Sequence, residues 1–196
     1  MRLTIADVEA TPAHRLLQAP EARRHELARD INAAAYLRGS FVLRSGVSTD
    51  YYLDKYLFAT RPTILRRLAD LLGSRVPEDI VRLAGPALGA VPIVTAVSLE
   101  TGLPFVIVRA AAREYGARTQ IEGELHPEER VLVIEDVVST GSGALSAAEA
   151  LRAAGASVSG ILAVVDRCQG GREAIESRGL AFDALFTIDE LRGEAA

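Results

Sequence analysis

Between residues 80 and 188 the sequence alternates short apolar runs with segments of helical periodicity, and this alternation constrains the fold more than any other feature. The short runs predict strands and the periodic segments predict helices. The predicted strands are residues 80–84, 105–108, 131–135, 159–165 and 184–188, and the predicted helices are 91–100, 143–154 and 172–178. Such an order predicts an α/β fold with a mainly parallel central sheet flanked by helices.

The first 60 residues follow a different pattern. Residues 21–37 have an amphipathic helical spacing, with Gly39 as a plausible end, and residues 41–58 predict a small hairpin. Pro62 then opens a helix over 62–72. We expect residues 1–60 to form a small N-terminal hood, packed on an α/β core of residues 61–196.

Composition argues against several classes of protein. The net charge is −4 and there is no tryptophan, so neither a basic face nor an obvious stacking platform for nucleic acid is expected. The longest apolar runs are far shorter than the ~20 residues of a membrane-spanning helix. The N-terminus lacks the pattern of a secretion signal, and the lone Cys168 excludes an internal disulfide. We expect a cytoplasmic protein that binds neither nucleic acid nor membrane.

Residues 131–143 carry the clearest chemical signal. A predicted buried strand ends in Glu135 and Asp136, and the small residues Ser-Thr-Gly-Ser-Gly at 139–143 lead into a helix. Ligands of open α/β sheets bind at this edge, and a glycine-bearing loop at a helix N-terminus can surround a phosphate with backbone N–H groups. Because two carboxylates would repel that phosphate, their natural partner is a ribose diol or a magnesium ion. The pattern therefore indicates a sugar phosphate ligand.

Other readings of this segment fit less well. It has no Gly-Lys-Ser/Thr ending, which a P-loop requires, and no Gly-x-Gly-x-x-Gly, which a dinucleotide fold would show. The structural alternative is an ordinary strand-to-helix turn in which serine and threonine cap the helix. That alternative requires the acid pair, the hydroxyl groups and both glycines to be accidental.

The segment Val-Leu-Val-Ile-Glu-Asp-Val-Val-Ser-Thr-Gly-Ser-Gly at 131–143 resembles the 5-phosphoribosyl-1-pyrophosphate (PRPP) motif of type I phosphoribosyltransferases. Four further segments occur in the order seen in orotate phosphoribosyltransferases. They are 41–46 with Tyr51 and Tyr52, 85–92, 109–123, and 165–174. Together the resemblance covers most of the chain from 41 to 191.

The resemblance implies transfer of ribose 5-phosphate from Mg-PRPP to orotate in pyrimidine synthesis, with Mg²⁺ held mainly through PRPP and water. The implied PRPP-binding residues are Arg44, Ala87, Leu88, Gly89, Glu135, Asp136, Val137, Val138, Ser139, Thr140, Gly141, Ser142 and Gly143. The implied orotate-binding residues are Tyr51, Tyr52, Ser139 and Arg167, and the implied catalytic residues are Arg109, Arg113, Tyr115 and Asp136. A different reading of Arg167 is a surface ion pair with Asp166 or Glu173.

Residues 109–130 form an unusually long charged and glycine-containing segment between two buried strands, which predicts a mobile loop. In the family this loop reaches the neighbouring subunit of a homodimer. Here Ala110 stands where a first lysine is expected and Arg113 replaces a second; Arg44 likewise replaces a lysine. These departures leave two alternatives open: a phosphoribosyltransferase for another nucleobase, or a non-catalytic PRPP-sensing regulator. A solvated loop without a role is the structural alternative.

Overall fold

The computed structural model describes residues 20–42, 48–111 and 120–193 of the chain. Within these residues a six-stranded sheet has the order β5-β4-β3-β6-β7-β8. The strands are β3 (Arg82–Pro86), β4 (Phe105–Val108), β5 (Ile121–Glu122), β6 (Arg130–Val138), β7 (Ser157–Asp166) and β8 (Ala181–Thr187). All neighbouring strands are parallel except β5, which pairs antiparallel with β4. The predicted mainly parallel sheet is confirmed.

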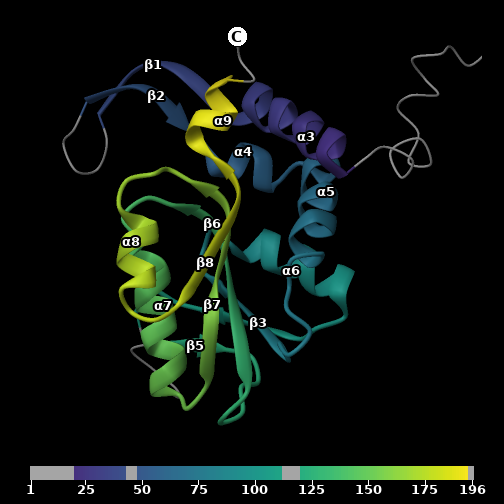
Figure 1. The fold of residues 1–196 in the computed structure, drawn as a ribbon, viewed down its shortest axis with the longest axis vertical. Coiled ribbons are helices and arrows are strands. Elements are labelled where there is room, and N and C mark those ends of the chain that lie inside the picture. Colours follow the sequence, from purple (N-terminus) through teal and green to yellow (C-terminus); the bar gives the residue numbers. More distant parts are fainter. Residues whose placement is uncertain (1–19, 43–47, 112–119, 194–196) are drawn as a thin grey trace, which may run out of the picture.

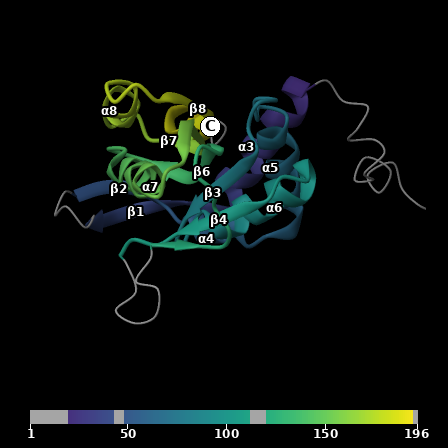
Figure 2. The same ribbon diagram turned by 90° about the horizontal axis from the view of Figure 1, so that it is seen from below.

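Helices cover both faces of this sheet. The helices α5 (Pro62–Gly73) and α6 (Val91–Thr101) lie on one face, and α7 (Ser142–Ala153) and α8 (Gly171–Glu176) on the other (Figures 1 and 2). Along β6, Leu132 and Ile134 belong to one apolar cluster, whereas Val131 and Val133 belong to the other. The strand is apolar on both sides because both sides are covered. In the part of the chain that the structure describes, no helix is long and apolar enough to span a bilayer.

A second group of elements lies over the carboxyl ends of the parallel strands (Figure 1). It consists of α3 (Pro20–Ala35), the antiparallel pair β1 (Tyr36–Val42) and β2 (Ser48–Leu53), α4 (Lys55–Ala59) and the C-terminal α9 (Ile188–Gly193). We call the N-terminal part of this group, α3 to α4, the hood. The first predicted helix was too long, since α3 ends at Ala35 and Gly39 lies inside β1. The predicted hairpin also continued too far, because Asp54 accepts a hydrogen bond from the backbone N–H of Tyr56 and starts α4.

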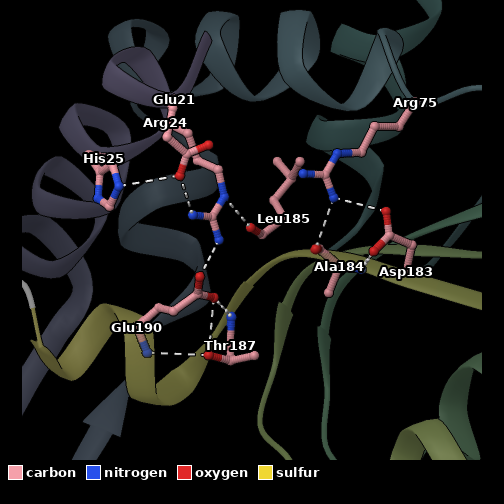
Figure 3. A network of polar contacts seen from close by, with 9 residues as sticks. All are labelled: Glu21, Arg24, His25, Arg75, Asp183, Ala184, Leu185, Thr187 and Glu190. Atoms are coloured by element: carbon pink, nitrogen blue, oxygen red, sulfur yellow. Dashed lines mark hydrogen bonds and ion pairs between the residues drawn. The ribbon is translucent and has the colours of Figure 1, made fainter.

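The hood is joined to the core through both polar and apolar contacts. Arg24 of α3 donates from Nε to the carbonyl of Leu185 (3.0 Å) and forms an ion pair with Glu190 of α9 (Figure 3). Leu27 and Ile31 are completely buried in the apolar cluster that also contains Leu185. The hood and the core therefore share one hydrophobic core. A division of the chain at residue 60 stays a prediction.

Candidate active site

Three segments that directly follow parallel strands lie at one edge of the sheet. The chain leaves β3 into residues 87–89, β6 into residues 139–141, and β7 into Arg167. Because β3 and β6 are adjacent, as are β6 and β7, these three segments are neighbours at the carboxyl edge, beneath the hood (Figure 1). This edge is where an open α/β sheet binds its ligand.

The acid pair lies inside strand β6 rather than at its end. The sequence predicted that the strand would stop at Glu135, but Val137 and Val138 continue the ladder with Val165 and Asp166 of β7. Both carboxylates are consequently buried, with Glu135 7% and Asp136 1% exposed. The Asp136 Oδ1 atom accepts a hydrogen bond from the backbone N–H of Val137.

The charges of this pair are set by burial and by one lysine. Burial, and next the neighbouring Asp136 carboxylate, raise the pKa of Glu135 well above its usual value. Asp136 has a direct cationic partner, since Lys55 Nζ of the hood lies 2.8 Å from its Oδ2 atom. Burial opposes the charged form of Lys55, yet its hydrogen bond to Asp136 and the charge of that carboxylate raise the pKa of the lysine. Lys55 thus stays charged beside Asp136, while Glu135 is driven toward its neutral form.

The segment after β3 lies directly against this ion pair. A Cβ atom on Gly89 would lie 1.7 Å from Asp136 Oδ2 and 2.7 Å from Lys55 Nζ, so position 89 cannot carry any side chain in this arrangement. Ala87 is fixed by a hydrogen bond from its N–H to the carbonyl of Val108 (2.8 Å), and the Ala87–Leu88 peptide bond is cis. The structure therefore brings the segment 87–89 against Asp136.

The loop after β6 leads into a helix start suited to an anion. Gly141 caps α7 in the left-handed conformation (φ 78°), and Thr140 Oγ1 donates to Ser142 Oγ (3.3 Å). No heavy atom lies within 4 Å of the Cβ position of Gly143, so there is space beside the first turn. On its other side the loop packs on Gly171 of α8, whose Cβ position lies 2.6 Å from the Ser139 carbonyl oxygen. The N–H groups of this first turn can bind a phosphate.

The third segment brings Arg167 to the hood. Its Nη2 atom donates to the Tyr51 hydroxyl (3.1 Å), and its guanidinium lies 5.4 Å from the centre of the Tyr51 ring. Tyr51 in turn stacks on Tyr36 (5.2 Å between ring centres). Tyr52 points to the opposite face of the hairpin, where its ring is 5.7 Å from that of Phe41. The structure therefore joins Arg167 to Tyr51 and separates Tyr52 from both.

The structure does not show the alternative ion pair between Arg167 and Asp166. The Asp166 carboxylate is buried, accepts a hydrogen bond from the backbone N–H of Cys168 (2.8 Å), and lies 3.8 Å from Arg172 Nε. Arg167 is left directed toward Tyr51, with a planar group able to bind a carboxylate by two parallel hydrogen bonds.

Comparisons with known proteins agree with this geometry. A family model described as phosphoribosyl transferase domain matches residues 59–180. The orotate phosphoribosyltransferase of Natronomonas pharaonis is 45% identical over 163 residues, which are 83% of this chain and 92% of that protein. That of Thermococcus gammatolerans is 43% identical over 174 residues, 87% of this chain and 92% of the relative. The chain belongs to the orotate phosphoribosyltransferase family.

Solved structures of the family have the same architecture. The orotate phosphoribosyltransferase of Aeropyrum pernix superposes with a TM-score of 0.77 at 29% identity, over 86% of this chain and 97% of the other. That of Mycobacterium tuberculosis in complex with PRPP gives 0.73 at 31% identity, over 87% and 99%. The predicted type I phosphoribosyltransferase fold is confirmed, and the chain is a pentosyltransferase.

The loop expected of an orotate phosphoribosyltransferase is described only at its two ends. Arg109 follows β4, with its N–H bonded to the Gln120 carbonyl (2.7 Å) and its guanidinium 3.6 Å from a Glu122 carboxylate oxygen. The sequence predicted a loop throughout 109–130, but the short strand β5 interrupts it because residues 121–122 pair with β4. The predicted site residues Arg44, Arg113 and Tyr115 lie outside the described residues.

Two side chains at the site of this orotate phosphoribosyltransferase were missed from the sequence. Lys55 contacts Asp136, and Arg192 of α9 places its guanidinium 4.7 Å from the centre of the Tyr51 ring while donating to the Tyr36 hydroxyl (2.9 Å). Lys55 has a signal that could have revealed it, since it is the single lysine in the sequence. Arg192 has none, because only the fold brings α9 against the hood.

Proposed function

We propose that this chain transfers ribose 5-phosphate from Mg-PRPP to N1 of orotate, giving orotidine 5′-monophosphate and pyrophosphate. The observation that carries the proposal is the order of groups along one edge of the sheet. The buried Asp136 lies beside the glycine segment 87–89, the helix start at 139–143 follows it in the chain, and Arg167 is on the next strand. This order matches a ligand with a pyrophosphate, a ribose diol and a 5-phosphate, next to a base that bears a carboxylate.

Each segment then has one role. Glu135 and Asp136 accept hydrogen bonds from the ribose hydroxyls, and residues 139–143 bind the 5-phosphate through backbone N–H groups and hydroxyls, with Val137 and Val138 supporting them. Residues 87–89 face the pyrophosphate, and Arg44 adds a cation. On the base side, Arg167 binds the orotate carboxylate, helped by Ser139 and the neighbouring Tyr51; Tyr52 belongs to the outer side of the same hairpin.

Magnesium enters with the substrate in this proposal. Among the described residues there is no cluster of three or more histidine, cysteine, aspartate or glutamate side chains around a common point. Mg²⁺ retains several waters and is commonly bound through one or two carboxylates together with substrate phosphates, which suits an ion carried on PRPP beside Glu135 and Asp136. Its charge, with that of nearby cations, would stabilise the departing pyrophosphate.

The remaining roles concern the loop and the assembly. We assign Arg109, Arg113 and Tyr115 to the transition state, on a loop within 109–130 that closes over the site of a second subunit in a cytoplasmic homodimer. The support is their position after β4, whose carboxyl end lies at the same edge of the sheet. Arg113 in place of a lysine keeps the charge but changes the shape of the group.

The test is a set of parallel assays with PRPP and magnesium, in which orotate is followed by its loss of absorbance and adenine, guanine, hypoxanthine and uracil are each supplied in its place. We expect turnover of orotate alone. In the variant Arg167→Met the KM for orotate should rise by roughly 10- to 100-fold, since a charged hydrogen-bonding group contributes about 1.5–3 kcal/mol, while the affinity for PRPP is retained. Turnover of another base, or PRPP binding without any turnover, would contradict the proposal in favour of the two alternative functions.

A further inference from the structure

Lys55 is chemically unique in this chain. Lysine and arginine together number 22, and 21 of these are arginine. The single lysine is the residue that contacts Asp136, the most deeply buried acid of the proposed site. An ammonium is compact and has three rotatable donors, whereas a guanidinium is broad and planar, so the two groups are not interchangeable at a confined position.

The space around the Lys55 side chain suits an ammonium better than the broader guanidinium. Its Nζ atom lies between Asp136 Oδ2, at 2.8 Å, and the backbone of Gly89, where a Cβ atom would be only 2.7 Å away. The start of α4 is fixed by the Asp54 cap, and Phe58 on the same short helix is completely buried. The lysine stem is therefore held in place, while its side chain remains 37% exposed.

The chemical structure of PRPP indicates which group Lys55 can contact. The pyrophosphate is attached to C1 of the ribose, next to the carbon that bears the 2-hydroxyl. A carboxylate that accepts hydrogen bonds from the ribose diol is consequently close to the pyrophosphate. A cation bound to that carboxylate, and touching the segment 87–89, has the leaving group within reach of its remaining donors.

We propose that Lys55 is a catalytic residue. Its ammonium binds the pyrophosphate of PRPP when the ribose hydroxyls replace it as the hydrogen-bond donors to the Asp136 carboxylate. The inference rests on the proposed function of this site. In the reaction the bond from C1 to the pyrophosphate oxygen breaks, and its electron pair stays on that oxygen. C1 bonds to N1 of orotate, and the N1 proton goes to solvent. Lys55 remains protonated throughout and stabilises the growing negative charge by hydrogen bonds.

The kinetic test compares Lys55→Met and Lys55→Arg with the matched control Arg178→Met. Arg178 forms an exposed ion pair with Glu149 at the far end of α8, outside the proposed site. We expect Lys55→Met to lower kcat on the order of 100-fold and to weaken product inhibition by pyrophosphate at least tenfold, with the KM for orotate changed far less. Lys55→Arg should recover only part of the loss, because the space beside Gly89 suits an ammonium. Wild-type kinetics in Lys55→Met would overturn the proposal.

A direct measurement separates this role from simple neutralisation of Asp136, and it does not depend on the folding of a variant. Incorporation of lysine labelled with ¹³C at the ε carbon gives one side-chain NMR signal, that of Lys55. Saturation with magnesium and inorganic pyrophosphate should shift this signal strongly, and inorganic phosphate should shift it much less. An unchanged signal, or no binding of pyrophosphate, would overturn the proposal.

The outcomes for Lys55 and for the proposed function are distinguishable. If the wild-type chain turns over orotate and Lys55→Met does so equally well, the role of Lys55 fails and the function stands. If no base is turned over but pyrophosphate shifts the lysine signal, the function fails and Lys55 remains a pyrophosphate ligand.

Discussion

At the scale of single residues, the buried Glu135 has a measurable effect on stability. Its pKa is raised in the folded chain by burial and then by Asp136, so the folded state holds a proton that the unfolded state has released. The stability linked to this proton is complete below about pH 4.5 and is lost as the pH rises through the folded-state pKa. At neutral and alkaline pH, Glu135 therefore destabilises the ligand-free protein.

The variant Glu135→Gln should consequently melt at a higher temperature than the wild type at pH 8, by roughly 2–4 °C for each kcal/mol of relief. At pH 4.5 the two proteins should melt at nearly the same temperature. Thermal unfolding at both pH values measures this difference, and PRPP binding should be weaker in the variant because one ribose acceptor is changed. An equal difference in melting temperature at both pH values would assign it to packing rather than to ionisation.

Candidate site residues could be identified from the sequence only where neighbours in the chain form a common pattern. Glu135 and Asp136 followed by a glycine-bearing loop form such a local signal, and so does Arg167 directly after a strand. Lys55 and Arg192 contact residues 81 and 141 positions away, respectively Asp136 and Tyr51, and no local pattern indicates those contacts. Tyr51 and Tyr52 were predicted as a pair, but adjacent residues of a strand point to opposite faces.

At the scale of elements, the phosphate loop depends on contact with the start of α8. A Cβ atom on Gly171 would lie 2.5 Å from Val138 Cγ1 and 2.6 Å from the Ser139 carbonyl oxygen. In Gly171→Ala the loop after β6 must therefore move, and we expect a loss of about 1–3 kcal/mol in the free energy of unfolding together with weaker PRPP binding. Chemical denaturation and calorimetric titration with PRPP measure the two effects.

Gly143→Ala is the matched comparison, because its added methyl group meets no heavy atom within 4 Å. Its stability should equal or slightly exceed that of the wild type, since alanine favours a helix over glycine. If Gly171→Ala were as stable as Gly143→Ala and bound PRPP normally, the contact between α8 and the loop would have no part in shaping the site.

The long elements with a clear periodicity, such as α5 and β7, were predicted correctly, and so was the four-residue β4, whose residues are all apolar. The elements that were missed are short: α4 has five residues, β5 has two and α9 has six. Short segments give few repeats of a helical or strand period, so tertiary contacts decide their structure. The Asp54 cap is a local signal for the start of α4. The pattern of residues 41–58 as a whole nevertheless predicts a hairpin.

At the scale of the whole molecule, the site is built between the hood and the sheet. Lys55 and Tyr51 come from the hood, whereas Asp136 and Arg167 come from the core. Correct placement of these groups therefore depends on how firmly the two parts are joined. The shared apolar cluster and the polar contacts of α3 with β8 and α9 form that connection (Figure 3).

Arg24→Met tests whether this connection makes the chain one cooperative unit. The change removes a hydrogen bond to the Leu185 carbonyl, an ion pair with Glu190 and a guanidinium 5.0 Å from the Phe186 ring centre, and we expect a loss of about 1.5–3 kcal/mol. The control Arg178→Met breaks only an exposed ion pair and should change stability by less than about 1 kcal/mol.

Hydrogen exchange locates the loss in Arg24→Met. If the hood and the core unfold together, the slowest amides of α3, β6 and β7 should all lose protection by the same free energy, because a shared core leaves no intermediate in which the sheet stands without α3. If only α3 loses protection, residues 1–60 are a separate unit that can detach, and removal of Arg24 would then lower catalysis by withdrawing Lys55 and Tyr51 while the sheet stays folded. Measuring exchange and kcat on the same variant decides between these two descriptions of the molecule.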